Sequence, residues 1–465
     1  MTPLWIIVVP WIMAPWVYLF RRRSTMAAFL SAGTSLAVAV ICFLLPPDQT
    51  VWILGRGLLF DPWRRWLLLF LFAGAVLLFL YSWHLSQGWS FFPFLLVALG
   101  LLAGSAMVDN FLLAVLLLEL AGIILAFLIQ GGPRADPRVA MGYLVSLSIA
   151  SSCLIFSTHL FDLVALYPED LVSVRLAMTA LTLGFGILLA VVPFHLFLPA
   201  VTQEAPPMVA TFLLGFYQVV ALSLMLGLLD RQPWLGSEAF DLLLVAGLIT
   251  ALGGGLFAFL ERAPGRLLAY GTISDLGLIL VGLGTASGVG VAGAMAHLIN
   301  RSLAIALVAM SWGVISERYG GERSTMPLGV ARALPWATLG YILGGLTLAG
   351  FPPTGLATRW PIYLALLSHN PRYTFGLILG GLGVAWGYLR SLTPILGRGK
   401  RPSGGSVRHP EVSRDRRAAS EEKEPLLVAV MIVTLVGTSL LLGIYPDYLL
   451  EPLRNMVEGF SFVGG

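Results

Sequence analysis

Long apolar runs recur along the whole chain and leave room for few other architectures. A run of roughly 20 apolar helical residues is long enough to cross the hydrocarbon core of a bilayer. We therefore predict an all-α polytopic membrane protein with about 14 transmembrane helices. The predicted helices lie near 3–20, 26–46, 65–83, 90–108, 111–130, 140–158, 175–199, 208–229, 240–260, 266–285, 289–315, 334–368, 373–396 and 425–445.

The composition excludes a soluble globule. Of the 465 residues, 58% are hydrophobic and 11% are charged, whereas roughly 25% are charged in an ordinary soluble domain. The only two lysines are Lys400 and Lys423, so the other basic residues are arginines. They lie mostly in short loops, where they set topology. We expect the lipid bilayer as the surroundings and no nucleic acid as a partner.

The position of the basic residues predicts the orientation in the membrane. Arg21, Arg22 and Arg23 follow the first apolar run, whereas a secretory signal carries its basic residues before that run. We therefore interpret the run as a first membrane helix. With the N-terminus outside, most arginines and lysines fall in inward loops. The positive-inside rule thus predicts a multi-pass protein of a prokaryotic plasma membrane with both termini outside.

One hydrophilic stretch interrupts this pattern at 397–424. Its Gly, Ser, Pro and Arg content cannot bury a core, so we predict a cytoplasmic linker there. The expected organisation is a three-helix segment at 1–83, five-helix repeats at 84–230 and 231–396, this linker, and a transmembrane helix with a tail at 425–465.

No residue pattern predicts a cofactor or a metal site in this chain. Cys42 and Cys153 are far apart and form no CxxC or Cys/His spacing, and the six histidines lack haem-like spacing. No dinucleotide-binding fingerprint lies between a strand and a helix. The 51 glycines are better explained by close helix packing.

Prolines break two of the predicted membrane helices. Pro193 and Pro199 interrupt the seventh helix, and Pro352 and Pro353 interrupt the twelfth. Proline frees backbone carbonyls, which inside a bilayer need a protein or water partner. Broken helices at corresponding positions of two halves are typical of inverted-repeat transporters, and these two lie five helices apart. We therefore predict two inverted five-helix repeats.

Four motifs carry a resemblance to a known family. They are VDNFLLAVLLLELAG, PFHLFLP followed by VTQEAPP, RLLAYGTISDLG, and AGFPPTGLATRW. With these motifs the chain resembles the antiporter-like membrane subunits of respiratory complex I and the related Mrp-type cation/proton antiporters. VTQEAPP and the PPTG run are more similar to the N-type subunit than to the longer L-type.

The resemblance implies a chain of charged side chains along the membrane midplane, through which relatives are thought to move protons. Glu119 matches the glutamate of that chain on the fifth helix. The lysines do not match: Leu188, Gln218 and Ile305 stand at lysine-type positions, and Arg359 replaces the lysine of the twelfth helix. Arginine exchanges protons poorly because its pKa lies above about 12.

The residues themselves leave structural and functional interpretations open. Asp275 is expected to pair with Arg301 or His297, as a rigid salt bridge or as a hydrated relay. His195 either caps carbonyls freed by the proline break or relays protons. Glu119 is a proton carrier or a packing acid, and we expect an arginine as its partner. The candidates for a proton path are Glu119, His195, Gln218, Asp275, His297, Arg301 and Arg359.

The sequence therefore predicts a proton-translocating, antiporter-like membrane subunit of a complex I-like NADH (or other donor):quinone oxidoreductase. Quinone, flavin and iron–sulfur clusters are expected in partner subunits of the membrane assembly, and no cofactor is expected in this chain. The alternatives are a scaffold subunit that has lost its own proton path, an independent Mrp-like antiporter, or a membrane partner of a soluble enzyme.

Overall fold

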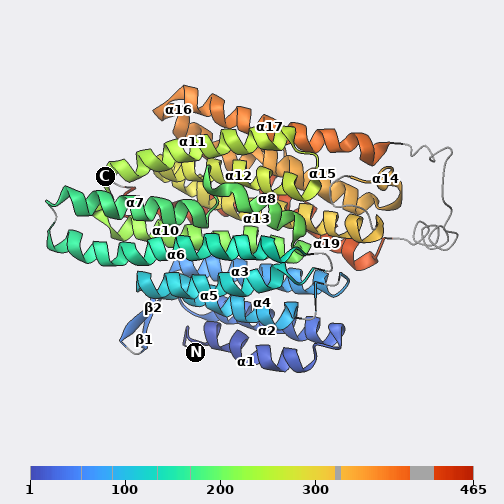
Figure 1. Ribbon diagram of the computed structural model, residues 1–465, viewed down its shortest axis with the longest axis horizontal. Coiled ribbons are helices and arrows are strands. Elements are labelled where there is room, and N and C mark those ends of the chain that lie inside the picture. Colours follow the sequence, from blue (N-terminus) through green and yellow to red (C-terminus); the bar gives the residue numbers. More distant parts are fainter. Residues whose placement is uncertain are drawn as a thin grey trace.

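A computed structural model describes residues 2–53, 55–85, 87–88, 90–132, 135–167, 169–319, 326–397 and 424–463. Within them the chain is a bundle of helices with one short hairpin (Figure 1). The predicted linker at 397–424 lies outside the described residues, except for its two ends.

The first third of the chain forms six helices and the hairpin. Asp61, Asn110 and Asp136 cap the helices that follow them by accepting backbone hydrogen bonds. The elements are α1 (Trp5–Leu19), α2 (Ser24–Leu44), β1 (Gln49–Ile53), β2 (Arg56–Phe60), α3 (Pro62–Ser82), α4 (Phe91–Met107), α5 (Phe111–Ile129) and α6 (Pro137–Leu166).

The middle of the chain contains the first interrupted helix and a π-helical turn. Its elements are α7 (Leu171–Leu188), the 3₁₀ turn η1 (Phe194–Phe197), α8 (Leu198–Glu204), α9 (Pro207–Phe212), the π turn η2 (Leu213–Tyr217), α10 (Gln218–Arg231), the 3₁₀ turn η3 (Pro233–Leu235), α11 (Gly236–Leu260) and α12 (Pro264–Gly284).

The last part contains the second interrupted helix. Its elements are α13 (Gly288–Tyr319), α14 (Val330–Ala333), α15 (Pro335–Ala349), α16 (Leu356–His369), α17 (Pro371–Leu396), α19 (Leu426–Ile444) and α20 (Asp447–Val457).

Eleven helices of the described chain are long and apolar enough to cross a membrane. Helices α1 and α4 are apolar but shorter, and α15 and α16 are two halves of one broken run. Each of the 14 predicted runs contains described helix, although the number of crossings and the inverted repeats stay predictions.

Both predicted proline breaks occur in the structure, with boundaries that differ from the prediction. The helix expected at 175–199 begins earlier and its α-helical part ends at Leu188, ahead of Pro193. Pro199 starts a new short helix instead of closing the old one. The run at 334–368 divides at Gly350, and Pro352 and Pro353 lie in the turn that joins the two halves.

The hairpin and α20 are among the elements of the structure that were not predicted. The antiparallel hairpin pairs Gln49 with Phe60 and Ile53 with Arg56, and its tight turn contains Gly55 at φ +76°. The helix α20 lies in the stretch that was predicted as a tail. Both elements are too short and too mixed in polarity to stand out beside long apolar runs.

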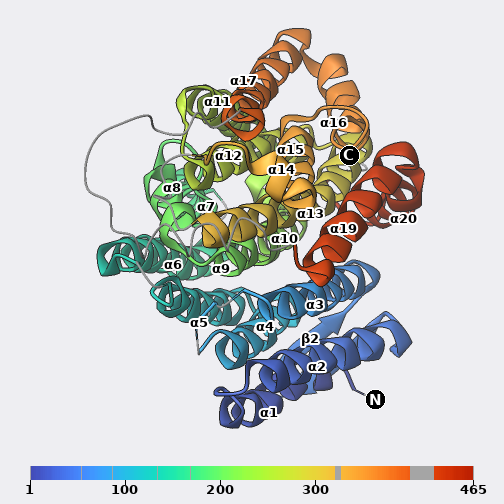
Figure 2. The same cartoon turned by 90° about the vertical axis from the view of Figure 1, so that its right-hand side faces the viewer.

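Helices α12 and α13 lie in the centre of the bundle (Figure 2). In the most apolar window of α12, 94% of the residues are buried, against 39% for α11 and α19. Glycines let α11 and α12 approach closely, since a Cβ atom at Gly254 or Gly277 would collide with the backbone of the other helix. This close packing fixes the position of Asp275, the acidic side chain of α12, within the bundle.

The two ends of the chain lie at one end of the bundle (Figure 1). The hairpin lies at this end too, whereas α14 and the described residues that flank 398–423 lie at the opposite end.

Candidate functional site

Asp275 on α12 is the centre of a buried cluster of charged side chains. Its Oδ1 lies 2.8 Å from Nε2 of His297 on α13 and accepts a hydrogen bond from Arg359 on α16. Its Oδ2 lies 3.7 Å from Nε of Arg301, also on α13. The exposed fraction of these four residues is 1% to 3%. Three helices thus place one acid against three basic groups.

The charges of this cluster do not cancel. With His297 neutral, one carboxylate faces two guanidinium groups, and the net charge is positive. A buried charge is costly unless it is paired and hydrogen-bonded. Asp275 Oδ2, Arg301 Nε and Arg359 Nε have no hydrogen-bond partner among the described atoms. The cluster therefore keeps unused donors and an unused acceptor in a buried place.

Arg301 connects the cluster to α10 and to the first broken helix. Its Nη1 donates to the carbonyl of Leu214 in the π turn at 2.9 Å, and its Nη2 donates to Oε1 of Gln218 at 2.8 Å. The Nε2 of Gln218 in turn donates to the carbonyl of Leu189 at 3.2 Å, where α7 ends. A π turn leaves carbonyls outside the regular helical pattern, and Arg301 uses one of them.

On its other side, His297 connects the cluster to the second broken helix. Its Nδ1 lies 2.9 Å from the hydroxyl of Thr358, and the oxygen of that hydroxyl accepts a hydrogen bond from Asn300 at 3.1 Å. Asn300 donates to the carbonyl of Thr354 at 2.9 Å, in the turn between α15 and α16. Ser439 on α19 donates to Asn300 at 3.5 Å. A polar chain therefore runs from one helix break to the other.

The structure brings together five of the seven sequence candidates, and Asp275 contacts both of its expected partners. The polar chain holds Gln218, Arg301, Asp275, His297 and Arg359. Its neutral members, which include Asn300 and Thr358, were not singled out from the sequence. The spacing of His297, Asn300 and Arg301 puts them on one helix face, and this signal could have found Asn300.

His195 lies apart from the Asp275 cluster. Its ring stacks on Phe257 with the centroids 5.3 Å apart and meets Tyr270 edge-on. The residue is buried, and its Nδ1 has no hydrogen-bond partner among the described atoms. The carbonyl of Leu189 is bonded by Gln218 instead. The ring of His195 interacts with the backbone of Pro193, so the capping role considered above stays a prediction.

Glu119 also lies apart from the cluster, on α5. It is half-buried, and no ion pair joins it to an arginine within the described residues. The expected arginine partner is therefore not found in this part of the chain, and it stays a prediction. Leu188 and Ile305, at two lysine-type positions, are buried apolar side chains.

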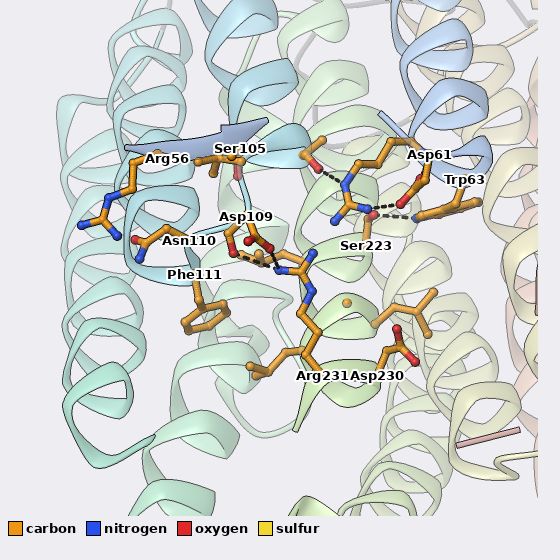
Figure 3. Close-up of a pocket in the computed structure, with 18 of the residues that line it drawn as sticks. Arg56, Asp61, Trp63, Ser105, Asp109, Asn110, Phe111, Ser223, Asp230 and Arg231 are labelled. Carbon is orange, nitrogen blue, oxygen red and sulfur yellow. Dashed lines mark hydrogen bonds and ion pairs between the residues drawn. The ribbon is translucent and has the colours of Figure 1, made fainter. Parts of the chain in front are cut away.

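A polar pocket of about 430 Å³ lies at the end of the bundle that carries the termini (Figure 3). The hairpin, α3, α10 and the turn between α4 and α5 line it. Arg64 pairs with Asp61, and Arg231 pairs with Asp109 at 2.5 Å. Trp63 donates to Ser223 at 2.9 Å.

These contacts favour a structural role for the pocket. Its arginines and aspartates are mostly paired with each other, and the backbone of Ser461 donates to Asp230 at 2.7 Å. Arg56 points away from these pairs in Figure 3. The pocket joins the hairpin and the C-terminal residues to the bundle, and the buried polar chain is the stronger functional candidate.

Known proteins are similar to this chain over most of its length. Formate hydrogenlyase subunit 3 of Escherichia coli (strain K12) is 27% identical in an alignment 385 positions long, which covers 75% of this chain and 60% of that protein. NADH-quinone oxidoreductase subunit N 2 of Acidobacterium capsulatum is 27% identical in an alignment 480 positions long, which covers 93% of this chain and 92% of that protein.

The fold is also found in a solved respiratory assembly. A chain of the membrane-bound sulfane sulfur reductase, an archaeal respiratory membrane complex, matches with a TM-score of 0.84 at 18% identity, over 98% of this chain and 97% of that one. The family model described as NADH:quinone oxidoreductase/Mrp antiporter, TM, matches residues 108–378. This region includes Glu119, both helix breaks and the Asp275 cluster, and the chain belongs to that family.

Proposed function

We propose that this chain is a proton-translocating, antiporter-like membrane subunit of an oxidoreductase complex related to NADH:quinone oxidoreductase. Family membership supports the proposal, as does the similarity to a subunit N over nearly the whole chain. Quinone, flavin and iron–sulfur clusters would lie in partner subunits, and other membrane subunits would cover parts of the bundle.

The observation that carries the proposal is the buried polar chain between the two helix breaks. Proton movement inside a membrane needs a row of groups that donate and accept hydrogen bonds. Asp275 and His297 can exchange protons, Gln218 and Thr358 can pass hydrogen bonds, and Arg301 and Arg359 stay charged. In this path the arginines hold the carboxylate in place and do not carry the proton.

The orientation is part of the proposal. Both termini lie at one end of the bundle, and the residues that flank 398–423 lie at the other. Most basic residues of the loops belong to the second end, so the positive-inside rule puts that end in the cytoplasm of a prokaryote and the termini outside.

Co-purification tests the assembly. The native complex is extracted from its own membranes in mild detergent, and the proteins that accompany this chain are identified by mass spectrometry. Subunits with quinone and iron–sulfur sites support the proposal. Recovery of the chain alone, or with one soluble protein, contradicts it and favours an independent antiporter or a membrane partner of a soluble enzyme.

Reconstituted vesicles test the proton path. We expect Asp275→Asn to lower the number of protons moved per electron, whereas the exposed control Glu238→Gln leaves it unchanged. If Asp275→Asn prevents assembly, His297→Gln tests the same path with a milder change.

A scaffold subunit is the second candidate. One sequence observation favours it, since both lysines lie in the hydrophilic stretch and none in an apolar run. An unchanged proton-to-electron ratio in assembled Asp275→Asn and His297→Gln complexes would establish this scaffold role instead of translocation.

A further inference from the structure

An apolar groove of about 630 Å³ lies between α11 and α17. The two helices pack side by side at the opposite side of the bundle from α1 (Figure 2). Apolar side chains and glycines of both helices line the groove, together with Phe351 from the turn between α15 and α16. Three of the lining residues, Leu256, Leu382 and Trp386, are exposed by 52–60%. The groove is therefore open on the outer surface of the bundle.

The length of the groove matches one leaflet of a bilayer. On α17 its lining extends from Leu379 to Leu389, which is about 15 Å along a helix. The hydrocarbon core of a bilayer is roughly 30 Å thick, so one leaflet supplies about half of this thickness. Phe351, in the second helix break, lies at the Leu379 end of the groove, because the nearby carbonyl of Ala349 would touch a Cβ atom at Gly381. A groove of this length fits an acyl chain of one leaflet, whereas a helix that crosses the membrane needs a contact surface along both leaflets.

Arginine side chains lie at the other end of the groove. Arg390 follows Trp386 by four residues, so both lie on one face of α17. The guanidinium of Arg390 donates to the carbonyl of Glu261, directly after the end of α11. The next residue, Arg262, is exposed.

The acid at this end does not neutralise the two arginines. The Glu261 carboxyl accepts hydrogen bonds from the backbone amides of Arg262 and Ala263 at 2.8 and 2.9 Å. Among the described residues, no ion pair joins Arg262 or Arg390 to a carboxylate. With one carboxylate and two guanidinium groups, this end of the groove carries net positive charge.

We propose that the groove binds one anionic phospholipid. Its acyl chain lies along the groove toward Phe351, and its phosphate accepts hydrogen bonds from Arg390 and Arg262. Guanidinium groups pair with phosphate through parallel N–H donors, and basic pockets between membrane helices on the cytoplasmic side bind anionic head groups. The placement of this lipid in the cytoplasmic leaflet rests on the orientation given in the proposed function.

The position of the groove gives the lipid a role at the Asp275 cluster. Gly380 lines the groove, and a Cβ atom on it would lie 3.4 Å from Oγ of Ser274, the residue before Asp275. Because Gly380 has no side chain, little protein separates the groove from this part of α12. An acyl chain in the groove excludes water from this side of the cluster.

Density maps of the native complex in phosphatidylglycerol nanodiscs test the site. We expect an elongated density from Phe351 to Arg390 with a phosphate peak beside the guanidinium. Leu382→Trp and Leu256→Trp each put a larger side chain at the opening of the groove, so each should remove this density. Both positions are well exposed, and two variants cover a failure of one to assemble. Leu441→Trp on α19 is the matched control, because Leu441 is 52% exposed and lies on another side of the bundle.

A titration of the delipidated complex with phosphatidylglycerol, followed by native mass spectrometry, tests the charge. Arg390→Gln should weaken binding about fivefold, since one arginine near the membrane surface contributes about 1 kcal/mol. Arg138→Gln is the control, because Arg138 is an exposed arginine near the start of α6, at the same end of the bundle. It should leave the affinity unchanged. Phosphatidylcholine with the same acyl chains should bind more weakly than phosphatidylglycerol.

A helix of a partner subunit in the groove, or a groove without density in phosphatidylglycerol nanodiscs, overturns the proposal. Equal affinity of Arg390→Gln and the wild type, or of the two lipids, overturns it as well. These readouts do not depend on pumping. Failure of the proposed function would appear separately, as an unchanged proton-to-electron ratio in Asp275→Asn.

Discussion

The two broken helices use different side chains to form hydrogen bonds with the backbone groups that the breaks leave free. At the break between α15 and α16, the charged Arg359 donates to the freed carbonyl of Leu348 and to Asp275 at once. At the break after α7, the neutral Gln218 donates to the carbonyl of Leu189, and Thr250 accepts from the backbone of Val192 at 3.2 Å. Charged side chains stabilise one break, and neutral polar side chains stabilise the other.

The difference shows where charge is concentrated in the bundle. Asp275, His297, Arg301 and Arg359 all belong to the second half of the chain, whereas His195, beside the first break, stacks on aromatic rings. Arg301 extends from the second half to Gln218 in the first. Arg301 of the second half therefore supplies the positive charge at Gln218, the lysine-type position of the first half.

Asp275→Ala should have the largest effect on stability. It leaves two buried guanidinium groups without their carboxylate, and removal of one partner from a buried pair costs about 3–5 kcal/mol. The measurement is the free energy of unfolding of the purified subunit in mixed micelles. A decrease in the free energy of unfolding of less than about 1 kcal/mol would mean that water or lipid already stabilises the charges of the arginines. The second break would then not depend on the Asp275 carboxylate, and the two breaks would not differ in this way.

A double-mutant cycle sharpens the same comparison. Asp275→Asn and Arg359→Gln remove two groups in direct contact, so their effects on unfolding should differ from additivity by about 0.5–3 kcal/mol. Asp275→Asn combined with His195→Gln should be additive within about 0.5 kcal/mol, because the two sites share no contact. If Asp275→Asn shows the same coupling energy with His195→Gln as with Arg359→Gln, the two breaks are energetically coupled and do not differ as described above.

Gln218→Leu tests the neutral break, with a smaller expected effect. The change leaves Nη2 of Arg301 without Oε1 of Gln218 and leaves the Leu189 carbonyl without its donor. Unsatisfied buried groups cost about 1–3 kcal/mol each, but leucine recovers part of the loss through apolar packing. Thr250→Val is the control for the same break. A greater loss in the control would place the main support of this break on Thr250.

Much of this architecture could be predicted from the sequence. The length of the apolar runs and the positions of Pro193 and Pro352 are local properties, and they locate helices and breaks without a structure. The pairing of Asp275 with His297 follows from polar residues on two successive apolar helices, which pack together in the structure.

The remaining features depend on how the helices are rotated and packed. Gln218 was interpreted as the loss of a cation, but Arg301 from another helix fills that place. The arginine expected beside Glu119 is not found among the described residues, where this half-buried acid forms no ion pair. The π turn places the carbonyl of Leu214 where Arg301 can donate to it, and no residue spacing predicts such a turn.

His195→Phe should have the smallest effect of this series. The imidazole makes ring contacts with Phe257 and Tyr270, and a phenyl ring of similar size keeps them. Because Nδ1 has no partner within the described chain, its removal should change the free energy of unfolding by less than about 1 kcal/mol. The proton-to-electron ratio of reconstituted complexes should also stay at the wild-type value. If the proton-to-electron ratio falls while the free energy of unfolding stays the same, His195 takes part in proton transfer at the first break. The first half of the bundle would then move protons without the Asp275 cluster.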